Sequence, residues 1–136
     1  MRPIIIDTNA YSALKRADSA IVEIIQYAEA IVISPIVIGE LLFGFDNGNQ
    51  GAVNRLDLQK FLDSPRVTVF PILSETAHFY SQITLSLKRK GTPIPTNDIW
   101  IAAQAFEHGC VVCTYGQHFR TIDGLAVASS LSELIV

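Results

Sequence analysis

Three acidic residues stand where a carboxylate could do chemistry. Asp7 directly follows a run of three isoleucines, Glu40 lies within an apolar helical pattern, and Asp98 falls in the first turn of a predicted helix. Taken singly, Asp7 is typical of a helix N-cap, and Asp98 of an acid that favours the helix dipole. If the three converge at one edge of a sheet, their charges repel. A hard divalent cation, Mg²⁺ or Mn²⁺, is the usual remedy for such repulsion.

Glu40 is the hardest of the three to explain as an ordinary surface residue. Its neighbours on the predicted helix are apolar, namely Ile36, Val37, Leu41 and Phe43. A carboxylate in such surroundings needs a counter-ion or takes a raised pKa. The alternative explanation is a glutamate at an interface, or one whose aliphatic stem lies along apolar surface.

Short apolar runs alternate with longer helical patterns along the chain. The predicted strands cover residues 3–6, 30–33, 67–70, 110–113 and 125–128, and they are continuous apolar runs, as expected for parallel strands covered on both faces. The predicted helices cover residues 8–15, 19–29, 35–45, 53–62, 75–90 and 97–108. Ser34, Ser74 and Thr96 are the expected N-caps.

This βαβ alternation predicts an α/β fold, a three-layer α/β/α sandwich around a mostly parallel central sheet. Ligands of such sheets bind beyond the carboxyl ends of the strands, where Asp7 stands. The chain has 136 residues and shows no internal repeat or linker, so we expect residues 1–136 to form a single domain.

Composition narrows the function further. Hydrophobic residues make up 49% of the chain and charged residues 17%, which argues against disorder and leaves apolar surface for a partner. The net charge of −3 argues against a protein that holds nucleic acid by bulk charge, although a nuclease needs only a local basic rim. No stretch predicts a membrane span or a secretory signal, so we expect a cytoplasmic protein.

The cysteines and histidines do not form a site in the sequence. Cys110 and Cys113 lie in a predicted buried strand, where positions i and i+3 face opposite sides, and are expected to be free core thiols. His78, His108 and His118 are scattered without the spacing of metal ligands, which favours surface or helix-end roles.

Several segments together resemble one family. They are the Ile-Asp-Thr-Asn run near the N-terminus, Ile38-Gly39-Glu40-Leu41-Leu42-Phe43-Gly44, Pro95-Thr96-Asn97-Asp98-Ile99-Trp100-Ile101-Ala102-Ala103, Thr114 to Phe119, and Gly124-Leu125. In this order they resemble the PIN-domain ribonucleases, and most closely the VapC toxins of type II toxin–antitoxin pairs, over essentially the whole chain.

The resemblance implies a set of site residues and a reaction. Asp7, Glu40 and Asp98 would be the catalytic, metal-binding acids, with Thr8 and Asn9 as supporting polar residues. The implied activity is that of an Mg²⁺-dependent endoribonuclease, in which Mn²⁺ substitutes, that cleaves RNA to leave a 5′-phosphate and a 3′-hydroxyl. The implied partners are the RNA substrate, a VapB-like antitoxin and a second copy of the chain.

Two further sets of residues have possible roles at such a site. Thr114 would orient the attacking water or the phosphate. A basic rim that contacts phosphates would comprise Lys88, Arg89, Lys90 and Arg120. The three successive cations before Gly91 are equally well explained as the C-terminal turn of a helix, and the two explanations are compatible.

The chain departs from the family at the fourth acidic position. The family run Thr-Asn-Asp-x-His-Phe is here Thr-Tyr-Gly-Gln-His-Phe, so Gly116 stands where an acid is expected, and Asp123 is the next acid in the sequence. The alternative function is therefore a catalytically impaired PIN domain that acts as an RNA- or antitoxin-binding module. A phosphoacceptor receiver domain also gathers acids at a sheet edge, but its third strand ends in aspartate, whereas here it ends Val69-Phe70-Pro71.

Overall fold

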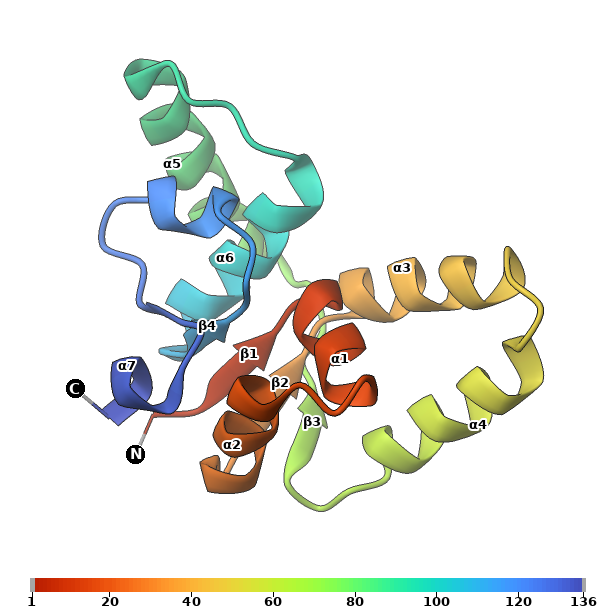
Figure 1. Cartoon of the computed structure of the whole chain (residues 1–136). Coiled ribbons are helices and arrows are strands. Elements are labelled where there is room, and N and C mark those ends of the chain that lie inside the picture. Colours follow the sequence, from red (N-terminus) through yellow and green to blue (C-terminus); the bar gives the residue numbers. More distant parts are fainter. Residues whose placement is uncertain (1, 136) are drawn as a thin grey trace.

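The computed structural model describes residues 2–135, and its centre is a parallel sheet (Figure 1). The strands are β1 (Ile4–Ile6), β2 (Ile31–Ile33), β3 (Val67–Val69), β4 (Val111–Cys113) and β5 (Val127–Ala128). All five are parallel, in the order β3-β2-β1-β4-β5. In the middle of the sheet, Ile5 pairs with Val32 on one side and Val112 on the other.

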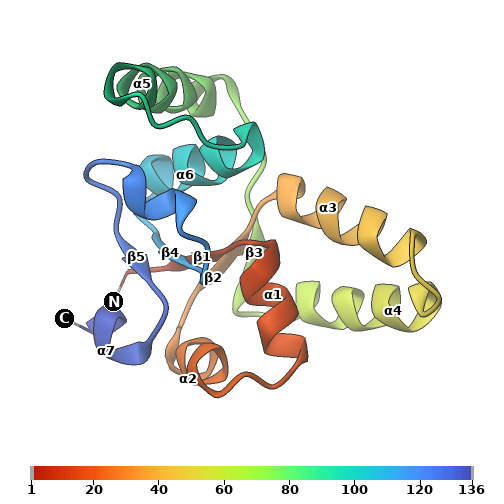
Figure 2. The ribbon, with the colours of Figure 1, turned by 45° about the horizontal axis from the view of Figure 1, so that its top comes forward.

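Helices cover both faces of this sheet. They are α1 (Thr8–Lys15), α2 (Ser19–Tyr27), α3 (Pro35–Asp46), α4 (Gly51–Leu62), α5 (Ser74–Lys90), α6 (Thr96–His108) and α7 (Leu131–Ile135), with a short 3₁₀ helix η1 (His118–Thr121). Figure 2 shows α6 on one face, with α5 stacked outside it, and α1 and α2 on the other. The predicted three-layer α/β fold is confirmed.

The three central strands are apolar throughout because both of their faces are covered. Every residue of β1, β2 and β4 is buried, as the continuous apolar runs predicted. Strand β3 lies at the edge of the sheet and is partly exposed, which accommodates the polar Thr68. The rigid centre of the sheet therefore ends in Asp7, Ser34 and Thr114, which directly follow β1, β2 and β4.

Helices α3 and α4 form an arm that extends from the body of the molecule (Figures 1 and 2). Only Val37 and Leu41 of α3 are buried, and the side chain of Phe43 is 71% exposed. The apolar pattern of α3 thus does not mean that the helix lies in the core. Part of that pattern leaves apolar side chains at the surface of the arm.

The predicted boundaries differ from the structure mainly at helix ends. Helix α2 ends two residues early, α4 begins two residues early, and η1 and α7 were not predicted. Ser34 caps α3 as expected, by accepting a hydrogen bond from the Ile36 amide at 3.1 Å. Ser74 and Thr96 are instead the first residues of their helices. No helix within residues 2–135 combines the length and apolar character needed to cross a membrane.

Candidate active site

Buried polar residues mark one edge of the sheet. Asp7, Ser34 and Thr114 are among the few buried polar side chains, and each stands at the carboxyl end of a central strand. The connections from β1 run to β2 and β3 on one side, whereas β4 and β5 lie on the other. The crevice between the ends of β1 and β4 is therefore the topological switch point, where open α/β sheets bind their ligands. Asp7 and Thr114 flank it.

Both carboxylate oxygens of Asp7 have partners that fix its orientation. Oδ1 accepts a hydrogen bond from the Ala10 amide at 2.8 Å, which makes Asp7 the N-cap of α1. Oδ2 accepts one from the Thr114 hydroxyl at 2.5 Å. Burial raises the pKa of the Asp7 carboxyl, an effect that these hydrogen bonds oppose, and the negative charge of Asp98 raises that pKa further. The N-cap role and a site role thus coexist in one residue.

Glu40 reaches the same edge from the second turn of α3. Its Oε1 accepts a hydrogen bond from the hydroxyl of Thr8 at 2.8 Å, and Thr8 is the residue that follows Asp7. Its Oε2 lies 3.4 Å from the Asn97 side-chain amide, which donates to it from the start of α6. Glu40 is half-buried. Although its neighbours along α3 are apolar, its carboxylate is not buried among them.

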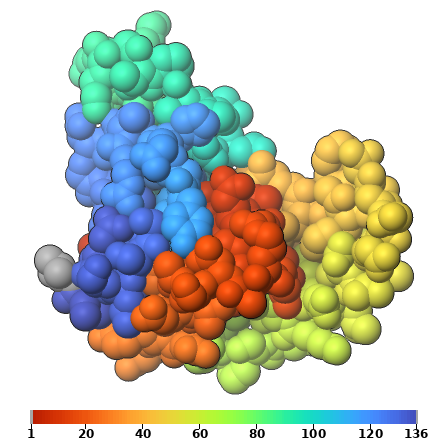
Figure 3. Space-filling model, viewed as in Figure 1, coloured from red at the N-terminus to blue at the C-terminus, as the bar shows by residue number. Residues whose placement is uncertain are grey.

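Asp98 lies in the first turn of α6 and faces the same region. Its Oδ2 lies 2.9 Å from Nδ1 of His118, which comes from η1. Its negative charge adds to the effect of burial and raises the pKa of the Asp7 carboxyl further. The N-terminal ends of α1, α3 and α6 thus direct three acids to one edge of the sheet, and Figure 3 shows the surface hollowed between the α5–α6 side and the α3–α4 arm.

Gly116 lies beside Asp7, where the resemblance expects a fourth acid. A Cβ at this position would stand 3.6 Å from Asp7 Oδ2 and 3.1 Å from Thr114 Oγ1. Its φ lies outside the left-handed region, so the backbone itself does not require glycine here. Asp123 does not replace the missing acid, because it is exposed and pairs with Nζ of Lys90 at 3.0 Å.

The residues present fit a hard cation in their chemistry. The site offers carboxylate and hydroxyl oxygens, the ligands that Mg²⁺ and Mn²⁺ prefer. Among residues 2–135, no lysine or arginine forms an ion pair with Asp7, Glu40 or Asp98, and the basic side chain that reaches them is His118, at Asp98. Asp7 and Glu40 accept hydrogen bonds from the neutral side chains of Thr114, Thr8 and Asn97. Within the same residues, no three His, Cys, Asp or Glu side chains lie close enough to form a finished ion cage.

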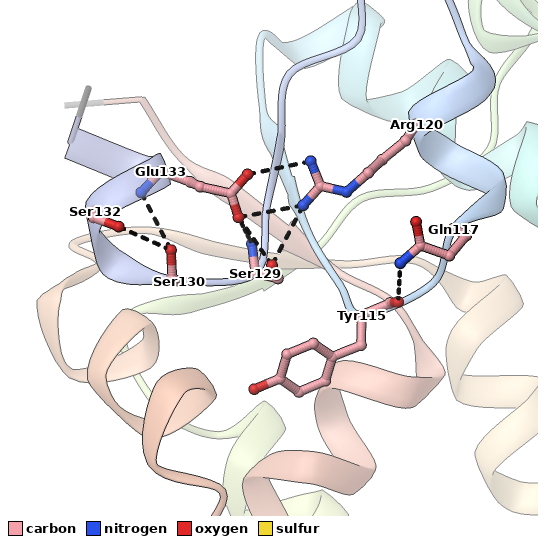
Figure 4. A network of polar contacts seen from close by, with 7 residues as sticks. All are labelled: Tyr115, Gln117, Arg120, Ser129, Ser130, Ser132 and Glu133. Atoms are coloured by element: carbon pink, nitrogen blue, oxygen red, sulfur yellow. Dashed lines mark hydrogen bonds and ion pairs between the residues drawn. The ribbon is translucent and has the colours of Figure 1, made fainter.

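The remaining predicted site residues lie apart from these acids. Asn9 is exposed on the first turn of α1. In the predicted basic rim, Lys88 and Arg89 are exposed at the end of α5, and Lys90 is paired with Asp123. Arg120 is turned toward α7, where it pairs with Glu133 at 3.2 Å and with Ser129 (Figure 4). This contact fastens η1 to α7.

Two residues near the acids were missed from the sequence. His118 was placed among surface histidines, and Asn97 was read only as part of a motif, yet they contact Asp98 and Glu40. Only their positions in the sequence could have indicated these contacts, since Asn97 precedes Asp98 and His118 follows Gly116 by two residues.

Cys110 and Cys113 are buried and free, as predicted. Burial raises the pKa values of their thiols to about 11 and about 12, so both thiols are protonated at neutral pH.

Comparison with known proteins places this geometry in a family. The PIN domain family matches residues 4–125. The chain is 33% identical over 133 residues to Ribonuclease VapC1 of Rickettsia felis, a match covering 96% of this chain and 98% of the relative. The chain belongs to the PIN-domain family and, within it, to the VapC group.

Further comparisons agree with this placement. Ribonuclease VapC2 of Rickettsia felis is 29% identical over 125 residues, covering 88% of this chain and 92% of the relative. The crystal structure of DNA-bound VapBC from Salmonella typhimurium contains a chain similar in fold, with a TM-score of 0.83 and 28% identity over 94% of this chain and 98% of that one. The matched PIN region contains Asp7, Glu40 and Asp98, whereas α7 lies beyond it.

Proposed function

We propose that this PIN-domain protein is an Mg²⁺-dependent endoribonuclease, the toxin of a type II toxin–antitoxin pair. The observation that carries the proposal is the buried carboxylate of Asp7 at the switch point of the sheet, with Glu40 and Asp98 directed to the same edge. The name of its relative, Ribonuclease VapC1, supports RNA as the substrate.

Asp7, Glu40 and Asp98 would hold the ion. When bound there, Mg²⁺ supplies charge neutralisation at the scissile phosphate and lowers the pKa of an attacking water. Burial raises the pKa of the Asp7 carboxyl, and a nearby positive charge would stabilise its ionised form, which supports a cation here. With three acids, we propose one strong metal site, and a second that forms with the substrate phosphate.

Neutral side chains position these carboxylates before RNA arrives. Thr114 donates its hydroxyl hydrogen to Asp7 and accepts from the Gly116 amide at 2.7 Å. In this arrangement Thr114 orients the carboxylate rather than a water, which modifies the role expected from the sequence. Thr8 fixes Glu40 in the same way, and His118 contacts Asp98.

The proposed protein partners are a VapB-like antitoxin and a second copy of the chain. The solved relative from Salmonella typhimurium is VapBC, and VapBC is a family of toxin–antitoxin systems. The exposed apolar side chains on the α3–α4 arm offer surface for such contacts. Lys88 and Arg89 remain the proposed phosphate contacts of the basic rim.

The second candidate function is a non-cleaving PIN domain that binds RNA or the antitoxin. It is favoured by Gly116, because this chain has no carboxylate at a position whose side chain would start directly beside Asp7 Oδ2. RNA cleavage that depends on added Mg²⁺ decides between the two functions.

The test compares Asp7→Asn, Glu40→Gln and Asp98→Asn in an RNA cleavage assay with Mg²⁺, alongside thermal melts. Each variant should lose at least ~100-fold in cleavage while remaining folded, because each removes one ligand charge. Glu29→Gln, at an exposed acid between α2 and β2, is the control and should cleave normally. Near wild-type cleavage by two of the three variants would show that the site is wrongly assigned.

A further inference from the structure

The loop after β4 carries an exposed aromatic ring next to the candidate site. Tyr115 follows Thr114, whose hydroxyl binds Asp7, and precedes Gly116, which adjoins the same carboxylate. The side chain of Tyr115 is 41% exposed. Neither the metal site nor the positioning of the acids uses this ring.

The ring is held in place by its far end. The Tyr115 hydroxyl donates a hydrogen bond to Asp18 Oδ1 at 2.6 Å, in the connection between α1 and α2. The same Asp18 oxygen caps α2 by accepting from the Ile21 amide at 3.2 Å. Because its hydroxyl is already bonded, the ring offers a partner only its apolar surface. Figure 4 shows it extending away from the Arg120–Glu133 contact.

The surroundings favour a nucleotide over other partners. Arg16 is the exposed C-cap of α1, two residues before the Asp18 that holds the Tyr115 hydroxyl, so a cation lies in the same connection. Gly116 has no side chain, so the residue after Tyr115 adds no bulk at the Asp7 carboxylate, where a Cβ would stand 3.6 Å from Oδ2. An exposed aromatic surface and a cation in the adjoining connection are features by which proteins bind single-stranded nucleic acid.

We propose that Tyr115 is a stacking platform for an RNA base close to the scissile phosphate, with Arg16 contacting the backbone of the same strand. This inference rests on the proposed ribonuclease function. It assigns substrate positioning to a residue of the loop where the chain departs from its family.

The test measures binding of single-stranded RNA of random sequence to the full chain carrying Glu40→Gln, which blocks cleavage under the proposed function. In this background Tyr115→Leu should weaken binding by ~5- to 100-fold, the range of one base–aromatic stack. Tyr115→Phe keeps the ring and should stay within ~3-fold of the parent. Tyr27→Leu is the matched control, since Tyr27 is also exposed but lies at the end of α2, and it should bind as the parent does.

A second probe separates stacking from a general loss of structure. A fully abasic ribose-phosphate oligomer of the same length should bind the parent more weakly than RNA does, and Tyr115→Leu should discriminate far less between the two probes. Arg16→Gln should lower the salt dependence of binding by about one phosphate contact.

The outcomes that overturn the inference differ from those that overturn the function. Equal RNA affinities of the parent and Tyr115→Leu, including the case in which this variant weakens only antitoxin binding, overturn the inference alone. A parent that binds no RNA overturns the proposed function and the inference with it.

Discussion

At the scale of single residues, Asp7 combines a structural role as a helix cap with a place in the candidate site. Its Oδ1 caps α1 and its Oδ2 is held by Thr114, so the carboxylate cannot turn away from the site. The side chain is only 4% exposed, and burial raises the pKa of its carboxyl. The ionised form is therefore costly in the folded protein unless a cation lies beside it.

The first prediction concerns the pH dependence that follows from Asp7. Because its folded-state pKa lies above its ordinary value of 3.8, the folded protein holds this proton more tightly than the unfolded chain. Its contribution to stability is thus full below pH ~3.8 and is lost as pH rises through the folded-state pKa. Asn at position 7 can accept from the Ala10 amide as aspartate does, and its Nδ2 would donate to Thr114 Oγ1, which reverses that hydrogen bond and removes the charge. Without metal, Asp7→Asn should therefore melt higher than wild type at pH 7, and the difference should shrink toward pH 4.

Thermal melts across this pH range make the measurement, with the exposed Asp63→Asn as control. Added Mg²⁺ should raise the melting temperature of the wild type and not that of Asp7→Asn. A wild type that is more stable than Asp7→Asn at pH 7 without metal would contradict the electrostatic account of this residue.

The second prediction concerns Gly116. Aspartate fits its φ, and the new Cβ would meet only the Thr114 hydroxyl at 3.1 Å as a close neighbour. Gly116→Asp should therefore fold and bind Mn²⁺ about tenfold more tightly, because it adds a carboxylate ligand. Cleavage should be equal or faster.

Calorimetric titration with Mn²⁺ measures this affinity. Gly116→Ala is the matched control, since it adds the same Cβ without the charge, and its affinity should equal that of the wild type. An unchanged Mn²⁺ affinity in a folded Gly116→Asp would show that residue 116 takes no part in the metal site.

At the scale of elements, the position of α6 decides where Asp98 and Asn97 lie. A buried polar contact fastens α6 to α5 on this face of the sheet. The Thr76 hydroxyl donates to Glu107 Oε1 at 2.6 Å and accepts from the Leu73 amide at 3.0 Å, so it joins α5, α6 and the segment after β3. Gln104 donates to the Phe70 carbonyl of that segment at 2.7 Å.

The third prediction tests this contact. Thr76→Val keeps the shape of the side chain but leaves the Leu73 amide and Glu107 without this partner, so it should lower the free energy of unfolding by about 1–3 kcal/mol. Thr84→Val removes an exposed hydroxyl from the same helix and should cost about 0.5 kcal/mol or less. Denaturant unfolding of both variants makes the measurement. Equal stabilities would mean that the contact is not needed to hold α6.

At the scale of the whole molecule, the α3–α4 arm carries both exposed apolar surface and one acid of the candidate site. Its exposed apolar side chains include Phe43 at 71%, Leu56 at 58% and Val53 at 56% exposure. The arm also carries Glu40 at its base, where α3 meets the sheet. A partner bound to the arm would therefore lie close to the acids.

The fourth prediction is that the isolated protein is a dimer through this arm. Light scattering at micromolar concentration should give a dimer for the wild type and a monomer for Phe43→Ser combined with Leu56→Ser, which should still fold because both side chains are exposed in the single chain. Leu85→Ser, at an exposed leucine of α5, should remain dimeric. A monomeric wild type would contradict this prediction.

The sequence by itself determined the layers of the fold and singled out the acids of the candidate site. Continuous apolar runs such as 31–33 and 111–113 predict buried parallel strands, because only a sheet covered on both faces favours such runs. Local signals also placed Asp7 at a strand end and Asp98 in a first helical turn. These features depend on neighbours within a few residues, which a sequence displays directly.

Only the tertiary structure decided which side chains meet. Asp7 and Thr114 are 107 positions apart, and Thr8 and Glu40 are 32 apart, so neither contact has a local pattern. The apolar pattern of α3 did not reveal that most of this helix lies at the surface, because a helix bordering an open surface has the same composition as one in a core. His118 was missed for a related reason: its partner Asp98 is brought to it by the packing of α6 against η1, and sequence spacing does not encode that approach.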